Sequence, residues 1–329
     1  MSALWKLIAA FSRFWDRVWF TRIDPLPVGV FRISLGILML SMYLCLYPHW
    51  LAYYGFSGVL SLNEPLLHAD VHDWLCLFNW TDGWGIPLRM LWGIAVLASL
   101  AFTLGWQTRA ATIVLYVLEV SIIHRNRFAI NGEDLVFRML LFYACFASLG
   151  SAVSIDDWLR RRRLRAQGQP VTEPESIPVW PIRLMQINIA LVYIISLPNK
   201  LVDDIAWSHG DAIYLSMVSN LWSRGYWPWL FYGWLGKLFT WGTILTEGTF
   251  PILVWFRKPR LYVIGAIASM HIGIAIFLKN VTFFSLSMVC SFLLFVPAET
   301  LRWAYTQLRS LWGKKILNGS ASGVTFKTS

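Results

Sequence analysis

The chain has 329 residues, of which 57% are hydrophobic, 16% aromatic and only 14% charged. This composition excludes an ordinary soluble globular protein and is typical of a polytopic membrane protein. The formal net charge of +10 does not indicate nucleic-acid binding, because the basic residues stand in short clusters beside apolar segments, as orientation signals do.

The first predicted element lies within residues 1–22, where aromatic and aliphatic residues alternate with Lys6, Arg13, Asp16 and Arg17 at helical spacing. Such a pattern predicts an amphipathic helix in the membrane interface that does not span the membrane. No removable signal peptide is expected, because a short apolar core with a small-residue cleavage site is missing.

Apolar segments then recur along the chain at a length suited to membrane helices. We predict an all-α fold, a polytopic bundle of about eight transmembrane helices, the third of them short, at residues 28–47, 86–105, 110–123, 134–153, 182–199, 235–256, 261–278 and 281–297. The transmembrane domain covers 23–300, with halves 23–155 and 180–300 joined by a basic linker, 156–179. Residues 301–329 are predicted to form a C-terminal helix and a disordered tail, beginning near Asn318.

The distribution of Lys and Arg residues between the segments predicts how the chain is oriented in the membrane. The arginine run at 160–163 and most other basic residues fall on one side, which predicts an even number of spans with both termini cytoplasmic. We interpret the run as a topology anchor, not a ligand site. The outer segments 48–85 and 201–234 are rich in Trp, Tyr, Gly and His, among them Trp74, Trp80, Trp84, Trp207, Trp222, Trp227 and Trp229, and are interpreted mainly as aromatic belt.

Ionisable residues inside a bilayer are costly, and each is a candidate for function. On the outer side we expect one pocket built from His124, Asn126, Asn131, Asp134, Arg138, Lys200, His209, Glu247 and His271. Asp134 and Arg138 stand one helical turn apart and are expected to pair. The four cysteines show no spacing typical of a metal site or a disulfide framework, and no metal is predicted.

Each candidate also has a structural interpretation. Lys200 suits an interface anchor as well as a base, and His271 suits a packing histidine. The Asp134 and Arg138 pair suits internal charge compensation, and Glu119 suits an interhelical hydrogen bond. The concentration of such groups on one leaflet favours a functional pocket over these separate explanations.

Several motifs resemble the HTTM (horizontally transferred transmembrane) domain family, which includes the membrane portion of vitamin K-dependent gamma-carboxylase. They are residues 104–111 (LGWQTRAA), 124–126 (HRN), 131–134 (NGED) and 154–156 (SID) with Arg138, then Tyr193, Lys200, Leu201, Trp207, Gly210, Ala212, Tyr214, Glu247, Pro251 and His271. The resemblance runs over roughly residues 20–300.

The resemblance implies that Lys200 is the base that deprotonates a vitamin K-like quinol, with His271 and Asn126 stabilising the oxyanion. Burial beside apolar walls favours the neutral amine that accepts a proton. A quinone or quinol is the implied cofactor. Glutamate carboxylation is not expected, because the carboxylase's large lumenal domain has no counterpart here.

Three hypotheses follow, the last of which is a structural membrane subunit with no pocket chemistry. One is a bacterial inner-membrane enzyme, carboxylase-like or an oxidoreductase, acting on a quinol or other lipid-like substrate at the periplasmic leaflet. The alternative is a non-redox maturation or accessory factor for an exported peptide or membrane partner, with the aromatic outer segments as its docking surface. The bilayer is the expected partner in all three cases.

Overall fold

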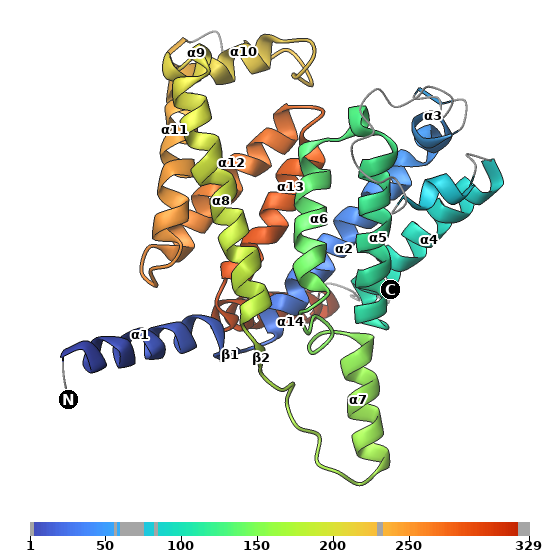
Figure 1. Ribbon diagram of the computed structural model, residues 1–329. Helices are drawn as coiled ribbons and strands as arrows, with labels where there is room; N and C mark the ends of the chain where they lie inside the picture. The colour runs from blue at the N-terminus through green and yellow to red at the C-terminus, as the bar shows by residue number, and fades with distance from the viewer. Residues whose placement is uncertain (1–2, 56–57, 60–75, 82–84, 229–232, 322–329) are drawn as a thin grey trace, which may run out of the picture. The chain divides into compact units, whose positions relative to one another are not determined.

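The computed structural model describes residues 3–55, 58–59, 76–81, 85–228 and 233–321. Within these residues the regular structure is almost entirely helical, which confirms the predicted all-α class (Figure 1). The two named strands, β1 (Arg22–Ile23) and β2 (Ile177–Pro178), form one short antiparallel pair in which Arg22 lies opposite Pro178. The expected aromatic residues Trp74, Trp84 and Trp229 lie outside the described residues.

The helices of the first half follow the predicted segments with shifted ends. They are α1 (Ala3–Trp19), α2 (Leu26–Leu46), α3 (Trp50–Tyr54), α4 (Gly85–Leu104), α5 (Thr108–Arg125), α6 (Gly132–Ala144) and α7 (Ile155–Ala166), with 3-10 turns at Tyr47–His49, Leu77–Thr81 and Arg127–Ala129. Helix α7 covers the beginning of the expected linker, 156–179, so the linker is partly helical.

The second half begins with a long apolar helix and ends with two short elements. Its helices are α8 (Trp180–Val202), α9 (Ile205–Ser208), α10 (Ala212–Val218), α11 (Gly233–Leu253), α12 (Arg260–Phe277) and α13 (Thr282–Phe292), followed by a 3-10 turn at Leu293–Phe295. The contacts divide the chain into one compact unit, Met1–Phe295, and a second unit, Val296–Ser329. The second unit contains α14 (Ala298–Ala321), which passes the position where a disordered tail was expected to begin.

Four described helices are long and apolar enough to cross a membrane, or five if one bent pair counts as a broken span. The predicted number of eight is therefore not confirmed. Helices α6 and α13 have only 13 and 11 residues, or roughly 20 and 17 Å at the usual rise per residue, which is short for a bilayer core of about 30 Å. Helix α5 contains three charged residues, Arg109, Glu119 and Arg125.

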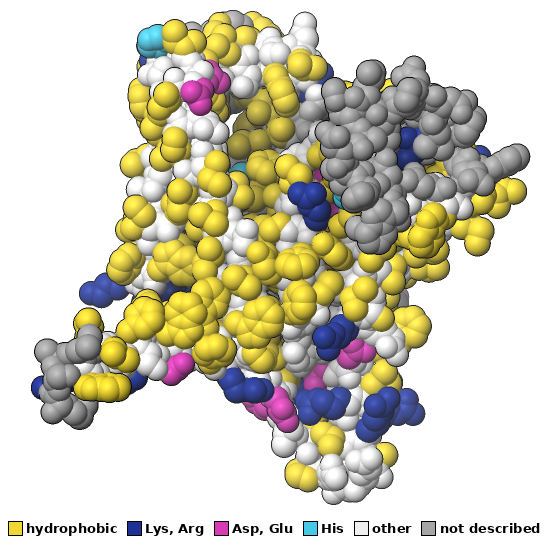
Figure 2. Space-filling model, viewed as in Figure 1, with side chains coloured by type: hydrophobic (Ala, Val, Ile, Leu, Met, Phe, Trp, Pro, Cys, Tyr) yellow, Lys and Arg dark blue, Asp and Glu magenta, His cyan; other side chains and the backbone are white. Residues whose placement is uncertain are grey.

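Packing joins the two halves of the first unit into one core. Helix α13 packs against α12 of its own half and against α2 and α6 of the other. Along α2, Phe31, Leu35 and Met39 recur at helical spacing and are fully buried. Figure 2 shows hydrophobic side chains over the middle of the visible face and Lys and Arg side chains around α7, a distribution typical of a multi-pass membrane protein.

Candidate functional site

Lys200 is held by side chains from two other elements. It lies in the last turn of α8, and its Nζ atom is 2.6 Å from both carboxylate oxygens of Glu247 on α11. Glu247 is buried, with 6% of its side chain exposed against 22% for Lys200. The Nζ atom also lies 4.4 Å from the centre of the Trp207 ring, a cation–π geometry. The ammonium group is therefore anchored within the protein.

The chain after α8 turns back so that Trp207 can reach Lys200. Asp204 caps α9 by accepting a hydrogen bond from the Ala206 backbone N–H at 2.9 Å. Gly210 then adopts a φ of +84°, and a Cβ atom there would lie 2.7 Å from Nε1 of Trp241. Both the left-handed backbone and the close approach to α11 require glycine at this turn.

His271 and Tyr193 form a second polar contact on the same side of α8. Tyr193 precedes Lys200 by two helical turns, and its hydroxyl lies 2.7 Å from Nε2 of His271 on α12. Both residues are 3% exposed and pack among the rings of Phe250 and Phe292. Within the described residues, Nδ1 of His271 has no hydrogen-bond partner. This nitrogen is therefore a buried polar atom without a partner among these residues.

Asn126 belongs to a different cluster, where its side chain holds a turn. Its Oδ1 atom accepts hydrogen bonds from the backbone N–H groups of Phe128 and Ala129, each at 3.2 Å, and its Nδ2 atom donates to the Tyr53 carbonyl at 2.9 Å. These bonds shape the 3-10 turn between α5 and α6. The expected oxyanion role for Asn126 would therefore compete with a structural one.

Asp134 is an N-terminal capping residue of α6. Its Oδ2 atom accepts a hydrogen bond from the Asn131 backbone N–H at 2.8 Å, one half of a capping box. The ion pairs formed by the described residues do not include Asp134 with Arg138. The expected pairing is therefore wrong, because the helix begins at Gly132 and the carboxylate turns back to satisfy its first backbone donors.

One cavity gathers only some of the residues that were expected to share a pocket. A cavity of about 750 Å³ is lined by Asn126, Asn131 and Asp134, whereas its described lining includes none of Lys200, Glu247 and His271. His124 is half-buried and bonds the Val120 carbonyl of its own helix at 2.7 Å. His209 is exposed at the end of α9, and Arg138 is half-buried on α6.

Sequence reasoning did not identify Glu133 or Tyr43 as candidates, and it gave Glu119 only a structural interpretation. Glu119 is fully buried and accepts a hydrogen bond from the Tyr43 hydroxyl at 2.9 Å, which confirms its predicted interhelical hydrogen bond. Glu133 lines the cavity with 7% exposed surface, and within the described residues its Oε2 atom has no partner. Tyr43 carries no signal in sequence, because it stands alone on an apolar helix.

In the part of the chain that the structure describes, no group of three or more His, Cys, Asp or Glu side chains is placed to hold a metal ion. Comparison with curated proteins and with solved structures found no match. A family model described as HTTM domain matches residues 20–300, which span the bundle from β1 to α14. Together with its apolar membrane-spanning helices, this match shows that the chain is an integral membrane protein that belongs to the HTTM domain family.

Proposed function

We propose that this protein uses the Lys200 and Glu247 pair to transfer a proton from a quinol or other lipid-like substrate, in a site resembling that of the carboxylase. The observation that carries the proposal is the contact of Nζ with both oxygens of a buried carboxylate, at 2.6 Å each. A lysine so placed has a proton acceptor of its own within hydrogen-bond distance.

The proton step needs two transfers. The Lys200 ammonium first passes a proton to Glu247, which leaves a neutral amine beside a carboxylic acid. The amine then takes the proton of a substrate hydroxyl, which produces an ammonium ion and a quinolate anion. The Tyr193 and His271 pair supplies hydrogen-bonding groups that stabilise the anion.

A second cavity supports a lipid-like substrate. It has a volume of about 450 Å³, lies between α10, α11 and α12, and is lined by Thr243 and Thr246 of α11 and by Met270 and Gly273 of α12. Its described lining does not include Lys200, Glu247 or His271. Most of its lining is apolar, as an isoprenoid or acyl tail requires. The face shown in Figure 2 is hollowed beneath α10.

The setting we propose is the bacterial inner membrane, with both termini cytoplasmic and the Lys200 end of α8 facing the periplasm. The excess of basic residues around α7 supports this orientation. The cofactor or substrate would then be a quinol dissolved in the bilayer, and an exported peptide would be a partner only under the alternative function.

The test is anaerobic titration of the purified full chain with menaquinol, followed by ultraviolet absorbance of the quinolate. Wild-type protein should shift bound menaquinol toward the quinolate. Lys200→Met and Lys200→Arg should each abolish the shift toward bound quinolate, because neither side chain takes the substrate proton. Arginine retains the positive charge but does not accept the proton.

Lys237→Met is the matched control, because Lys237 is an exposed lysine on α11, and it should behave as wild type. Full quinolate formation by Lys200→Arg would show that only charge is needed and would reject the base. If menaquinol does not bind wild-type protein while an exported peptide copurifies with it, the accessory function replaces this one.

A further inference from the structure

A cavity at the α7 end of the first unit lies apart from the Lys200 site. It has a volume of about 530 Å³ and lies between the beginning of α5 and one face of α7. Its lining combines three arginines with apolar side chains: Trp106, Gln107, Thr108, Arg109, Ala110, Asp156, Leu159, Arg160, Arg163, Leu164 and Gln167.

The acidic residue in this lining, Asp156, already accepts hydrogen bonds from within the protein. Asp156 accepts hydrogen bonds from the backbone N–H groups of Gln107 and Thr108, each at 2.9 Å, and from the Thr108 hydroxyl at 2.6 Å. It therefore caps α5 from a distant part of the chain. This capping occupies the backbone N–H groups at the beginning of α5. An anion in the cavity would therefore be attracted by the arginines of the lining.

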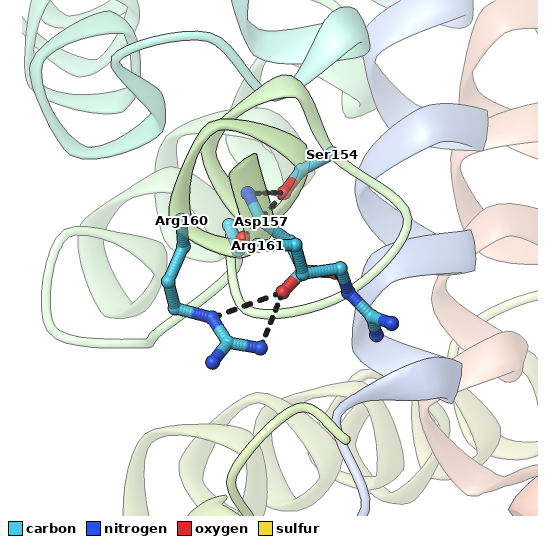
Figure 3. Close-up of polar contacts among 5 residues, drawn as sticks. Ser154, Asp157, Arg160 and Arg161 are labelled. Carbon is cyan, nitrogen blue, oxygen red and sulfur yellow. Dashed lines mark hydrogen bonds and ion pairs between the residues drawn. The ribbon is translucent and has the colours of Figure 1, made fainter. Parts of the chain in front are cut away.

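The next acid, Asp157, engages other arginines of the run. Its Oδ1 atom accepts from Arg160 at 2.8 Å and its Oδ2 atom from Arg161 at 2.7 Å, while its own backbone N–H donates to Ser154 (Figure 3). Arg162 lies 5.5 Å from the centre of the Trp158 ring. Three of the four consecutive arginines thus have an intramolecular partner.

Arg163 and Arg109 differ from these three. Both are exposed, both line the cavity, and neither side chain forms a hydrogen bond or an ion pair within the described residues. They approach the cavity from different helices, α7 and α5. A topology anchor needs only positive charge near the membrane, whereas convergence of two unneutralised guanidinium groups on one cavity is the geometry of a phosphate site.

The position of the cavity indicates which phosphate compound it would take. Trp106 comes two residues after the end of the spanning helix α4 and is 53% exposed, as residues of the interfacial aromatic belt are. Leu159 and Leu164 add apolar walls beside the arginines. A charged site with apolar walls at headgroup depth suits a molecule with an anionic head and a hydrocarbon body.

We propose that this cavity binds the headgroup of an anionic phospholipid. The phosphate lies between Arg109 and Arg163, and the glycerol and first acyl carbons lie against Trp106 and Leu159. Basic pockets between helices at the membrane surface are known to suit such headgroups. The site is independent of the proton-transfer function at Lys200.

The test is native mass spectrometry of the full chain in detergent, with phosphatidylglycerol and phosphatidylcholine as competing probes. Wild-type protein should retain phosphatidylglycerol in preference. Replacing both arginines (Arg109→Gln with Arg163→Gln) should reduce this retention roughly 30-fold, from the usual contribution of a basic residue near anionic lipid. The control, Arg162→Gln with Arg165→Gln, removes the same charge from residues outside the cavity and should retain the lipid.

Ala110→Trp fills the cavity at an exposed position without changing charge, and it should also lose phosphatidylglycerol. Equal loss in the two arginine double variants would overturn the proposal in favour of a diffuse electrostatic effect. Unchanged retention by Ala110→Trp would show that the lipid lies elsewhere. Displacement by a large excess of inorganic phosphate would assign the cavity to free phosphate instead.

Discussion

Arg32 shows how one residue can connect three segments of the bundle. It lies on α2 with none of its surface exposed. Its guanidinium donates to the carbonyls of Leu149 at 3.0 Å and Val153 at 2.6 Å, in the segment after α6, and approaches the Thr103 carbonyl near the end of α4. Carbonyls at and beyond the end of a helix have no hydrogen-bond donor within that helix. Arg32 supplies the donor here. The buried charge is tolerated because it replaces missing hydrogen bonds.

Arg32→Met should therefore destabilise the protein by about 2 to 4 kcal/mol, because the carbonyls would remain buried without a charged donor. The measurement is thermal unfolding in detergent of the variant and of wild type. Arg13→Met, at an exposed position on α1, is the matched control and should be nearly neutral. Equal stability of Arg32→Met and wild type would mean that water or lipid satisfies these carbonyls.

Sequence reasoning identified Lys200, Glu247 and His271 as members of one expected pocket, since an ionisable group on an apolar helix is conspicuous. It did not identify the contact between Lys200 and Glu247, because this depends on the rotation of α8 against α11, which no local spacing encodes. For Asp134, two local rules competed. The helical spacing to Arg138 suggested an ion pair, but the position of the helix start made Asp134 a capping residue.

Helices α2 and α4 pack closely because of a small residue at their contact. A Cβ atom on Gly36 would lie 2.4 Å from the Oγ1 atom and 2.9 Å from the Cα atom of Thr103. Helices in lipid gain little from burying apolar surface against each other, so close backbone approach at glycine is a main source of their association. Gly93 on α4 has no atom within 4 Å of the equivalent position.

Gly36→Ala should destabilise the protein by about 1 to 3 kcal/mol, because the methyl group would force the two backbones apart. Gly93→Ala should have the opposite sign and stabilise by up to about 1 kcal/mol, since alanine is the better helix former where space is open. Unfolding of both variants in the same detergent tests the pair. Matching effects in the two variants would show that helix propensity, and not packing, dominates at Gly36.

Element type was predictable from sequence, whereas element length was not. Apolar runs located α2, α4, α8 and α12, since a long run of this kind leaves little choice but a membrane helix. The same runs overestimated α6, which ends at Ala144 and not near Val153, because Arg32 donates hydrogen bonds to the carbonyls of the following non-helical segment. That stabilising contact comes from α2, more than a hundred residues earlier in the chain.

At the scale of the whole first unit, α8 determines which features share a side of the membrane. It has 23 residues, enough to cross the bilayer core, and it runs from β2 to α9. Figure 1 shows α7 near the β2 end and α9 at the opposite end. The proposed proton-transfer site and the proposed lipid site should therefore face opposite leaflets.

Cysteine labelling tests this separation in intact cells. In a chain whose native cysteines are replaced by alanine, Ser208→Cys on α9 should react with a membrane-impermeant maleimide, because both α9 and the Lys200 end of α8 face outward in the proposed orientation. Gln167→Cys, just after α7, should react only after the membrane is permeabilised. Both positions are exposed in the structure, so reactivity reports the side of the membrane and not burial. Reaction at both positions in intact cells would contradict the crossing of α8, and reaction at Gln167→Cys alone would invert the orientation.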